Sequence, residues 1–124
     1  MAGRVLVADD EPAVTEVMTL SLESAGYEVR SAHDGERALQ IARTERPDIA
    51  LLDVMMPRMD GREVCLRIKR DPQLSGMPVV LFSSMDERDV DWKAAGADAF
   101  LQKAFDIVAL PGIVERLLAE RKER

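Results

Sequence analysis

Short apolar runs alternate along this chain with longer segments of helical period, and this alternation constrains the fold more than any other feature. The clearest runs are residues 5–8, 49–52 and 79–82, each bounded by polar or turn residues. Such alternation is typical of a parallel sheet whose strands are joined by crossover helices. Continuous apolar runs indicate inner strands that are covered on both faces. The shorter or charge-interrupted runs at 27–29 and 99–101 indicate strands nearer the edges.

Three helices are predicted in the segments that separate the first apolar runs. One helix is predicted to open with Pro12 and to end at Gly26, and a weaker helical stretch follows Gly35. Asp60 with Glu63 three residues later is a capping pair that predicts another helix. The predicted inner faces of the first and third helices are Val14, Val17, Met18, Ser21 and Ala25, then Val64, Cys65 and Ile68. We therefore expect Cys65 to be a small core residue and no redox centre.

Two more helices are predicted in the last third of the chain. Ser84 and Glu87 have the spacing of a capping box, and Val90, Ala94 and Ala97 fall on one face of the helix that it would start. The Pro-Gly pair at 111–112 is tolerated only in a first helical turn, so the C-terminal helix should begin near residue 110. Its apolar stripe is Leu110, Ile113, Val114, Leu117 and Leu118.

Length and composition bound the kind of protein. With 124 residues, the chain is expected to form one domain, residues 1–124. Seventeen Lys and Arg against 23 Asp and Glu give a net charge of −6, which argues against nucleic-acid binding by this domain alone. No apolar run reaches the roughly 18 residues of a membrane span. Because the single cysteine cannot form an internal disulfide, we expect a reduced, cytoplasmic setting.

Polar residues stand directly after the predicted strands. Asp9 and Asp10 follow the first run, Asp53 follows the run at 49–52, Ser83 follows the run at 79–82, and Lys103 lies past the last one. In an open parallel sheet, ligands bind beyond the carboxyl ends of the strands. Three carboxylates and one lysine leave a charge that a divalent cation would balance, and oxygen donors favour Mg²⁺ over zinc or copper. Each carboxylate alone could equally be an ordinary polar strand end; the full set is less easily explained that way.

Three blocks of this sequence resemble the receiver domain of two-component response regulators, and the resemblance covers nearly the full chain. They are residues 7–12 (Val-Ala-Asp-Asp-Glu-Pro), residues 53–61 (Asp-Val-Met-Met-Pro-Arg-Met-Asp-Gly), and Gly-Ala-Asp at 96–98 followed by Lys103. The resemblance implies an α/β fold of the CheY-like, flavodoxin-like kind. Its doubly wound sheet would have five parallel strands in the order 2-1-3-4-5, with helices on both faces.

The resemblance also implies a function and assigns residues to it. The implied ligands of Mg²⁺ are Asp10 and Asp53 directly, Asp9 through water, and the backbone carbonyl of Met55. Asp53 would accept a phosphoryl group from a histidine kinase or phosphotransfer protein, while Lys103 and Ser83 cancel charge on its oxygens. Ser83 and Phe100 would form the switch pair. The protein would be a signalling module that catalyses only its own phosphoryl transfer and dephosphorylation.

The family's output face implies further contacts. It is formed by the helix expected at 84–97, the strand at 99–101 and the C-terminal helix, where a downstream protein would bind; a homodimer also stays open. On the helix at 84–97, Trp92 and Met85 would be aligned, either as a partner patch or with Trp92 covered by a loop. His33 is assigned no role.

The chain departs from the family at Ala104, where a proline usually follows the lysine. A cis peptide before a non-proline residue costs roughly 2.5 to 4 kcal/mol, so we expect a trans bond between Lys103 and Ala104. The resemblance also implies that the positions two residues beyond Asp53 and Ser83 tune dephosphorylation, and the apolar Met55 and Met85 found there predict slow hydrolysis of the phosphoryl group.

Three alternatives remain. One is a degenerate receiver that docks or dimerises without phosphorylation. Another is the N-terminal receiver of a longer DNA-binding regulator, since the charged residues 120–124 fit either a tail or a linker. A phosphohydrolase of the haloacid dehalogenase type would need an acid two residues after its nucleophile, where this chain has Met55.

Overall fold

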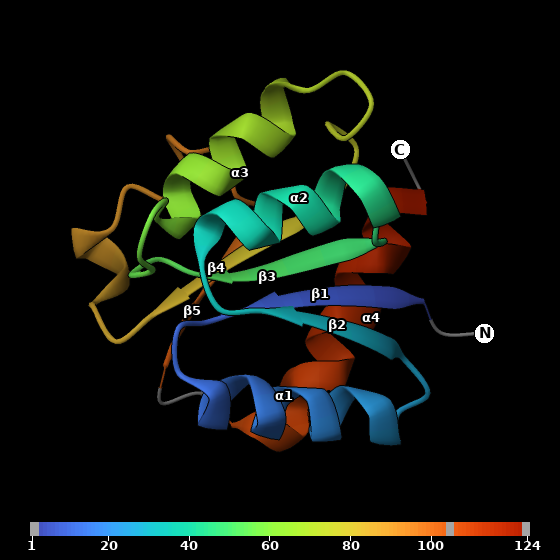
Figure 1. Ribbon diagram of the computed structural model, residues 1–124. Coiled ribbons are helices and arrows are strands. Elements are labelled where there is room, and N and C mark those ends of the chain that lie inside the picture. The colour runs from blue at the N-terminus through green and yellow to red at the C-terminus, as the bar shows by residue number, and fades with distance from the viewer. Residues whose placement is uncertain (1–2, 104–105, 123–124) are drawn as a thin grey trace.

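The computed structural model describes residues 3–103 and 106–122, which form a central parallel sheet between two layers of helices (Figure 1). The strands are β1 (Arg4–Ala8), β2 (Glu28–Ala32), β3 (Ile49–Asp53), β4 (Val79–Ser83) and β5 (Ala99–Gln102). All pairings are parallel, in the order β2-β1-β3-β4-β5. The three continuous apolar runs are the inner strands and the two interrupted runs are the edges, so the predicted doubly wound fold is confirmed.

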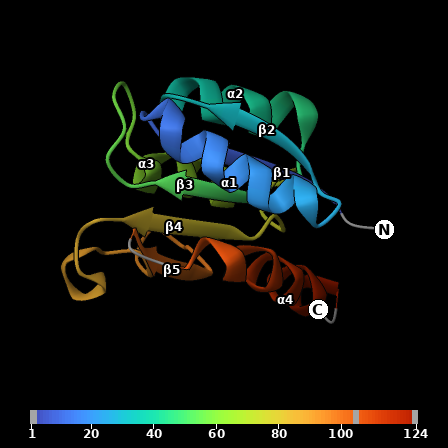
Figure 2. The same cartoon turned by 90° about the horizontal axis from the view of Figure 1, so that it is seen from below.

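The helices divide between the two faces of the sheet. They are α1 (Pro12–Ser24), α2 (Gly35–Glu45), α3 (Gly61–Arg70) and α4 (Leu110–Lys122), with short 3-10 helices η1 (Glu87–Asp89) and η2 (Ile107–Ala109). Figures 1 and 2 show α2 and α3 on one face and α1 and α4 on the other. The last helix begins at Leu110, as the Pro-Gly pair predicts. None of the helices in the described ranges has the length and apolar content needed to cross a membrane.

Local sequence explains where α2 and α3 begin. The Asp34 carboxylate accepts a hydrogen bond from the backbone N–H of Arg37, and the Asp60 carboxylate accepts from those of Arg62 and Glu63. Each carboxylate therefore satisfies donors that the first turn leaves unpaired. These caps therefore fix the residues at which α2 and α3 begin.

The core consists of two layers, one on each face of the sheet. Cys65 is buried on the α2 and α3 side, as predicted, and burial raises the pKa of its thiol to about 12. The predicted inner face of α1 is partly wrong. Its buried residues are Thr15, Met18 and Leu22, whereas Val17 is half-exposed. The helix is thus rotated slightly from the orientation that its apolar residues alone predict.

The helix predicted at 84–97 is wrong. Between β4 and β5 the structure has only η1 and a following hydrogen-bonded turn. The reason is a competing cap: the Asp86 carboxylate accepts from the backbone N–H of Arg88 and also pairs with its guanidinium, which closes a short 3-10 turn. Val90 then adopts an extended backbone, with φ −117° and ψ 127°. The predicted output face therefore lacks its first helix.

Two further predictions concern this end of the molecule. Trp92 is half-buried against the core on the α2 and α3 side, so its predicted alignment with Met85 on a helix is not formed. The Lys103–Ala104 peptide bond, predicted to be trans, lies outside the described residues. The connector predicted at 105–109 is described from residue 106 on, and its last three residues form η2.

Candidate functional site

Three carboxylates meet beyond the carboxyl ends of β1 and β3. Asp9 and Asp10 directly follow β1, and Asp53 is the last residue of β3. One oxygen from each of these side chains lies within 4.8 Å of the others. Asp9 and Asp53 are buried, with exposed fractions of 0% and 1%, while Asp10 is exposed. The sequence prediction that these three residues come together is confirmed.

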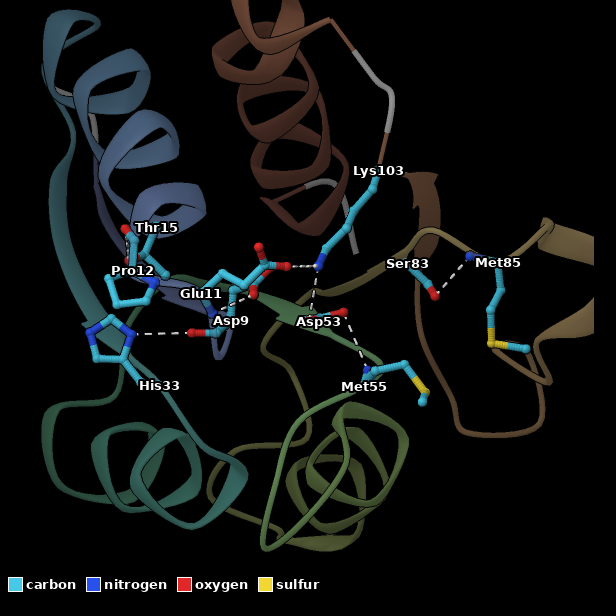
Figure 3. Close-up of polar contacts among 10 residues, drawn as sticks. All are labelled: Asp9, Glu11, Pro12, Thr15, His33, Asp53, Met55, Ser83, Met85 and Lys103. Atoms are coloured by element: carbon cyan, nitrogen blue, oxygen red, sulfur yellow. Dashed lines mark hydrogen bonds and ion pairs between the residues drawn. The ribbon is translucent and has the colours of Figure 1, made fainter.

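Lys103 reaches this cluster from beyond β5 (Figure 3). Its Nζ lies 3.1 Å from Oδ2 of Asp9, 3.3 Å from Oδ2 of Asp53 and 3.6 Å from Oε1 of Glu11. Its backbone N–H donates to the carbonyl of Ser83 at 2.7 Å, which fixes the start of the side chain beside β4. One ammonium group thus faces three carboxylates.

Short backbone contacts hold the two buried carboxylates in place. Oδ1 of Asp9 accepts from the backbone N–H of Glu11 at 2.9 Å, and Oδ1 of Asp53 accepts from that of Met55 at 3.2 Å. The first residue of α3, Gly61, packs so close to the Asp53 carbonyl that a Cβ there would overlap it. A glycine is therefore required at the point where α3 meets the loop after β3.

The charges in this cluster shift the protonation of its groups. Burial, and then the charge of Asp9, raise the pKa of Asp53 from 3.8 to about 6, although Lys103 and the Met55 N–H oppose this shift. For Lys103, burial lowers the pKa, but the close approach and the negative charges of Asp9 and Asp53 outweigh it, and the pKa is raised. The site therefore holds excess negative charge, and Lys103 stays charged at neutral pH.

The donor set fits a hard divalent cation. Oδ2 of Asp9 is fully buried and has no hydrogen-bond partner in the described part of the chain. Lys103 approaches that oxygen at 3.1 Å, which gives an ion pair without a well-directed hydrogen bond. A buried carboxylate oxygen left in this state is costly unless a further cation compensates it. Oxygen ligands of this kind suit Mg²⁺.

Ser83, at the end of β4, and Phe100, on β5, both contact the segment that follows β4. The Ser83 hydroxyl is buried and accepts a hydrogen bond from the backbone N–H of Met85 at 3.1 Å, as Figure 3 shows. Phe100 on β5 packs against the core on the α2 and α3 side and stacks on Trp92, with ring centroids 6.4 Å apart. In this state the two predicted switch residues contact the segment after β4.

The structure also gives the positions of Met55, Met85 and His33, which the sequence analysis considered. The side chains of Met55 and Met85 are exposed at 59% and 38%, so both lie at the surface around the cluster. The backbone carbonyl of Met55 remains a predicted ligand. His33, to which the sequence assigned no role, has its Nδ1 3.1 Å from the backbone oxygen of Asp9.

Sequence reasoning missed Glu11 as a member of the site. It stands within the acidic block that carried the resemblance, but its contact with Lys103 depends on how the chain turns from β1 into α1. The sequence feature that could have identified it is a third acidic residue directly after Asp9 and Asp10. Nothing in the sequence pointed to the contact between His33 and Asp9, because it joins the ends of two neighbouring strands.

Comparison with known proteins agrees with this geometry. Residues 5–115 match the model of the response regulator receiver domain. The chain is 44% identical over 112 residues to the response regulator PleD of Caulobacter vibrioides, covering 89% of this chain and 25% of that protein. It is 40% identical over 124 residues to the response regulator MprA of Mycobacterium tuberculosis, covering 98% of this chain and 53% of that one.

A solved structure shows the same architecture. The CheY-like response regulator receiver domain protein from Methanospirillum hungatei superimposes with a TM-score of 0.90 at 27% identity, covering 99% of this chain and 98% of that one. The chain spans between a quarter and about half the length of the two curated relatives named above. With the fold, the acidic cluster and its lysine in place, this chain belongs to the response regulator receiver domain family.

Proposed function

We propose that this chain is a phosphorylation-dependent switch in which Asp53 accepts a phosphoryl group from a histidine kinase or phosphotransfer protein. The observation that carries the proposal is the position of the Asp53 carboxylate. It is buried, lies 3.3 Å from Nζ of Lys103, and shares a compact cluster with Asp9 and Asp10. Phosphoryl transfer needs this combination of a positioned oxygen nucleophile and nearby positive charge more than it needs a strong base.

The reaction would proceed at the Asp53 carboxylate. One of its oxygens forms a bond to phosphorus while the bond from phosphorus to the donor histidine nitrogen breaks, and the electron pair of that bond stays on nitrogen. Lys103 would then pair with a phosphoryl oxygen, and the Ser83 hydroxyl would donate to another. The Lys103 backbone is already tethered to Ser83, so its ammonium needs little reorganisation, whereas the Ser83 hydroxyl would leave its contact with the Met85 N–H.

Mg²⁺ would be held by Asp10 and Asp53 directly, by Asp9 through water and by the Met55 carbonyl. When bound, it would neutralise charge on the carboxylates and on the transferred group. Receiver domains generally bind Mg²⁺ at an acidic cluster, and the buried Oδ2 of Asp9, which has an ion pair with Lys103 but no directed hydrogen bond, supports the same for this chain.

The test is the intact mass after incubation with acetyl phosphate, with and without Mg²⁺. The expected result is a gain of one phosphoryl group that requires Mg²⁺ and is lost in Asp53→Asn. Asp34→Asn is the matched control, because Asn caps a helix as well as Asp and the residue lies outside the cluster. Equal labelling of Asp53→Asn and the wild type would refute the assignment of the acceptor.

The competing proposals predict other results. A degenerate receiver that serves only for docking or dimerisation would take up no phosphoryl group from acetyl phosphate or from a kinase. A phosphohydrolase would turn over a phosphomonoester, for which the chain has Met55 at the position of the required second acid. Both are less well supported than the switch, because the acidic cluster and lysine are complete.

A longer regulator is a second candidate, because the chain spans only part of its relatives. We keep the proposal that residues 1–124 form one domain, which could stand alone or precede a DNA-binding output domain. Reading the coding sequence on from Arg124 distinguishes the two. Binding of a downstream protein or of a second copy at β5 and α4, and a cytoplasmic location, belong to the same proposal.

A further inference from the structure

Helix α1 makes a contact on each side of the short connection between β5 and η2. On the β5 side, the carboxylate of Glu11, the N-cap of α1, lies 3.6 Å from Nζ of Lys103, as Figure 3 shows. On the η2 side, the Ser21 hydroxyl donates a hydrogen bond of 2.7 Å to the backbone carbonyl of Ile107. The helix therefore meets the chain that carries Lys103 both before and after this connection.

The hydrogen bond of Ser21 is directed away from its own helix. Hydroxyls inside helices commonly donate to a carbonyl of the preceding turn, and Ser24 does so, 2.7 Å from the carbonyl of Ser21. Ser21 instead reaches an element 86 positions further along the chain. The Ile107 carbonyl also accepts from the N–H of Leu110, and its oxygen has a second lone pair for the hydroxyl. The Ser21 hydroxyl thus ties α1 to η2 without replacing a bond within either element.

The connection itself depends on how its two ends are held. Residues 103–106 have the sequence Lys-Ala-Phe-Asp, and proline, which would fix φ at its own position, is not among them. The conformations open to so short a connection are limited chiefly by its end points. At the first end, the Lys103 N–H donates to the Ser83 carbonyl at 2.7 Å. At the other end, the Ser21 hydroxyl holds Ile107.

The position of the Lys103 ammonium matters because its partners are fixed. Nζ lies 3.1 Å from Oδ2 of Asp9 and 3.3 Å from Oδ2 of Asp53, and both carboxylates are buried beside the inner strands. They cannot follow the ammonium if the backbone of Lys103 shifts. A displacement of about 1 Å, even one caused from far away, can lower the rate of a positioned reaction about a hundredfold.

We propose that Ser21 is a positioning residue for phosphoryl transfer and that it acts on the reaction through Lys103. Its hydrogen bond to Ile107 holds the far end of the connection after β5, and this keeps the ammonium within reach of Asp53. The inference rests on the proposed function, in which Lys103 pairs with a phosphoryl oxygen on Asp53. The role of Ser21 is indirect, because its hydroxyl binds η2 and not the reacting group.

Three single substitutions isolate the hydroxyl of Ser21. Ser21→Ala removes it and Ser21→Thr keeps it. Alanine suits a helix interior, and Ile107 retains its bond from Leu110, so Ser21→Ala is expected to fold. Ser24→Ala is the matched control, because it makes the same change in the same helix at a hydroxyl that bonds within α1. The loss of one such hydrogen bond should lower the ratio of held to released connection about fivefold.

The first experiment measures the initial rate of the mass gain from acetyl phosphate, with the whole chain at saturating Mg²⁺. Ser21→Ala should lower this rate about threefold to fivefold, whereas Ser21→Thr and Ser24→Ala should leave it unchanged. In Lys103→Met, which has no ammonium to position, adding Ser21→Ala should cause no further fall. An equal fall in both backgrounds would overturn the positioning role, because Ser21 would then act on the site without Lys103. An unchanged rate in Ser21→Ala would also overturn it.

The second experiment needs no phosphoryl group. Lysines of the unliganded protein are acetylated with an N-hydroxysuccinimide ester, and peptide masses give the modification of Lys103 relative to Lys93, which is exposed. An ammonium released from its carboxylates should react about threefold faster in Ser21→Ala, and equally fast in Ser21→Thr, Ser24→Ala and the wild type.

The outcomes separate this inference from the proposed function. Phosphoryl uptake by the wild type, with the same rate and the same Lys103 labelling in Ser21→Ala, would overturn the inference and leave the proposed function standing. No uptake by the wild type would overturn the proposed function and the part of Ser21 in the reaction. Labelling would then still decide whether Ser21 holds Lys103, and equal labelling of Ser21→Ala and the wild type would refute it.

Discussion

Replacing the Asp53 carboxylate with an amide of nearly the same shape, Asp53→Asn, should stabilise the metal-free protein at neutral pH. The carboxylate is buried beside Asp9, and its pKa is raised from 3.8 to about 6, first by burial and then by the charge of Asp9. A raised carboxyl pKa means that the folded state disfavours the charged form. Removing the charge removes that cost, and the attraction to Lys103 is already included in the raised value.

The size of the effect depends on pH. Below the unfolded pKa of 3.8 the carboxyl is protonated in both states and the cost is absent; it grows as pH rises toward about 6 and is complete above that. These two values correspond to a destabilisation of about 3 kcal/mol at pH 7.5 and about 1.5 kcal/mol at pH 5. The advantage of Asp53→Asn over the wild type should therefore fall by about half between these pH values.

The assay is urea unfolding in the presence of EDTA, followed by circular dichroism, for both proteins at both pH values. Comparing the two proteins at each pH cancels the titration of all other groups. Adding Mg²⁺ should stabilise the wild type more than the variant, because the ion binds the folded state and Asp53 is a proposed ligand. Asp34→Asn should unfold like the wild type throughout, since it changes a charge outside the cluster.

Two results would refute this reasoning. If Asp53→Asn were less stable than the wild type at about pH 7.5 without Mg²⁺, the carboxylate would be net stabilising and the cluster would not carry excess negative charge. If the stability difference were the same at both pH values, the carboxyl would already be ionised in the folded protein at pH 5, and the pKa of Asp53 would not be raised to about 6.

Three further predictions follow from the same contacts. Because Asp53 must lose its proton to bind Mg²⁺, the affinity for Mg²⁺ measured by calorimetry should be about tenfold weaker at pH 5 than at pH 7.5; equal affinities would contradict a ligand role for an Asp53 whose pKa is about 6. Lys69→Met, which leaves the Asp98 carboxylate without its lysine, should cost about 2 kcal/mol in urea unfolding, whereas Arg67→Met removes only an exposed pair and should cost below about 0.5 kcal/mol. Met55→Asn, which places a water-orienting amide beside the acceptor, should shorten the lifetime of phosphorylated protein in a mass time course; an unchanged lifetime would mean that this position does not limit hydrolysis.

The part of the site carried by β1 and β3 could be predicted from sequence because sheet topology decides it. Once the apolar runs at 5–8 and 49–52 are parallel neighbours, the acids after them must meet at one edge. No side-chain detail is needed for that conclusion. The individual contacts were beyond prediction, because the approach of Glu11 to Lys103 and the lack of a directed hydrogen bond to Oδ2 of Asp9 depend on side-chain torsions.

The failed helix at 84–97 has a different physical origin. Two caps compete within three residues, Ser84 for an α-helix and Asp86 for a 3-10 turn, and each is worth about 1 kcal/mol. Aspartates at 86, 89 and 91 weaken the helix by comparable amounts, while burial of Val90 is available in either arrangement. A sequence pattern cannot show which arrangement, the α-helix or the 3-10 turn, has the lower free energy when the difference is so small.

That near balance gives the two sides of the molecule different properties. On the side of β1 and β3, buried strands hold the carboxylates in a geometry that a single phosphoryl group has little means to change. After β4, two caps of similar strength compete, and the structure has only η1 and a turn there. The sequence therefore predicts the site where buried strands decide the geometry, and it misses the local structure where small free-energy differences between caps decide it.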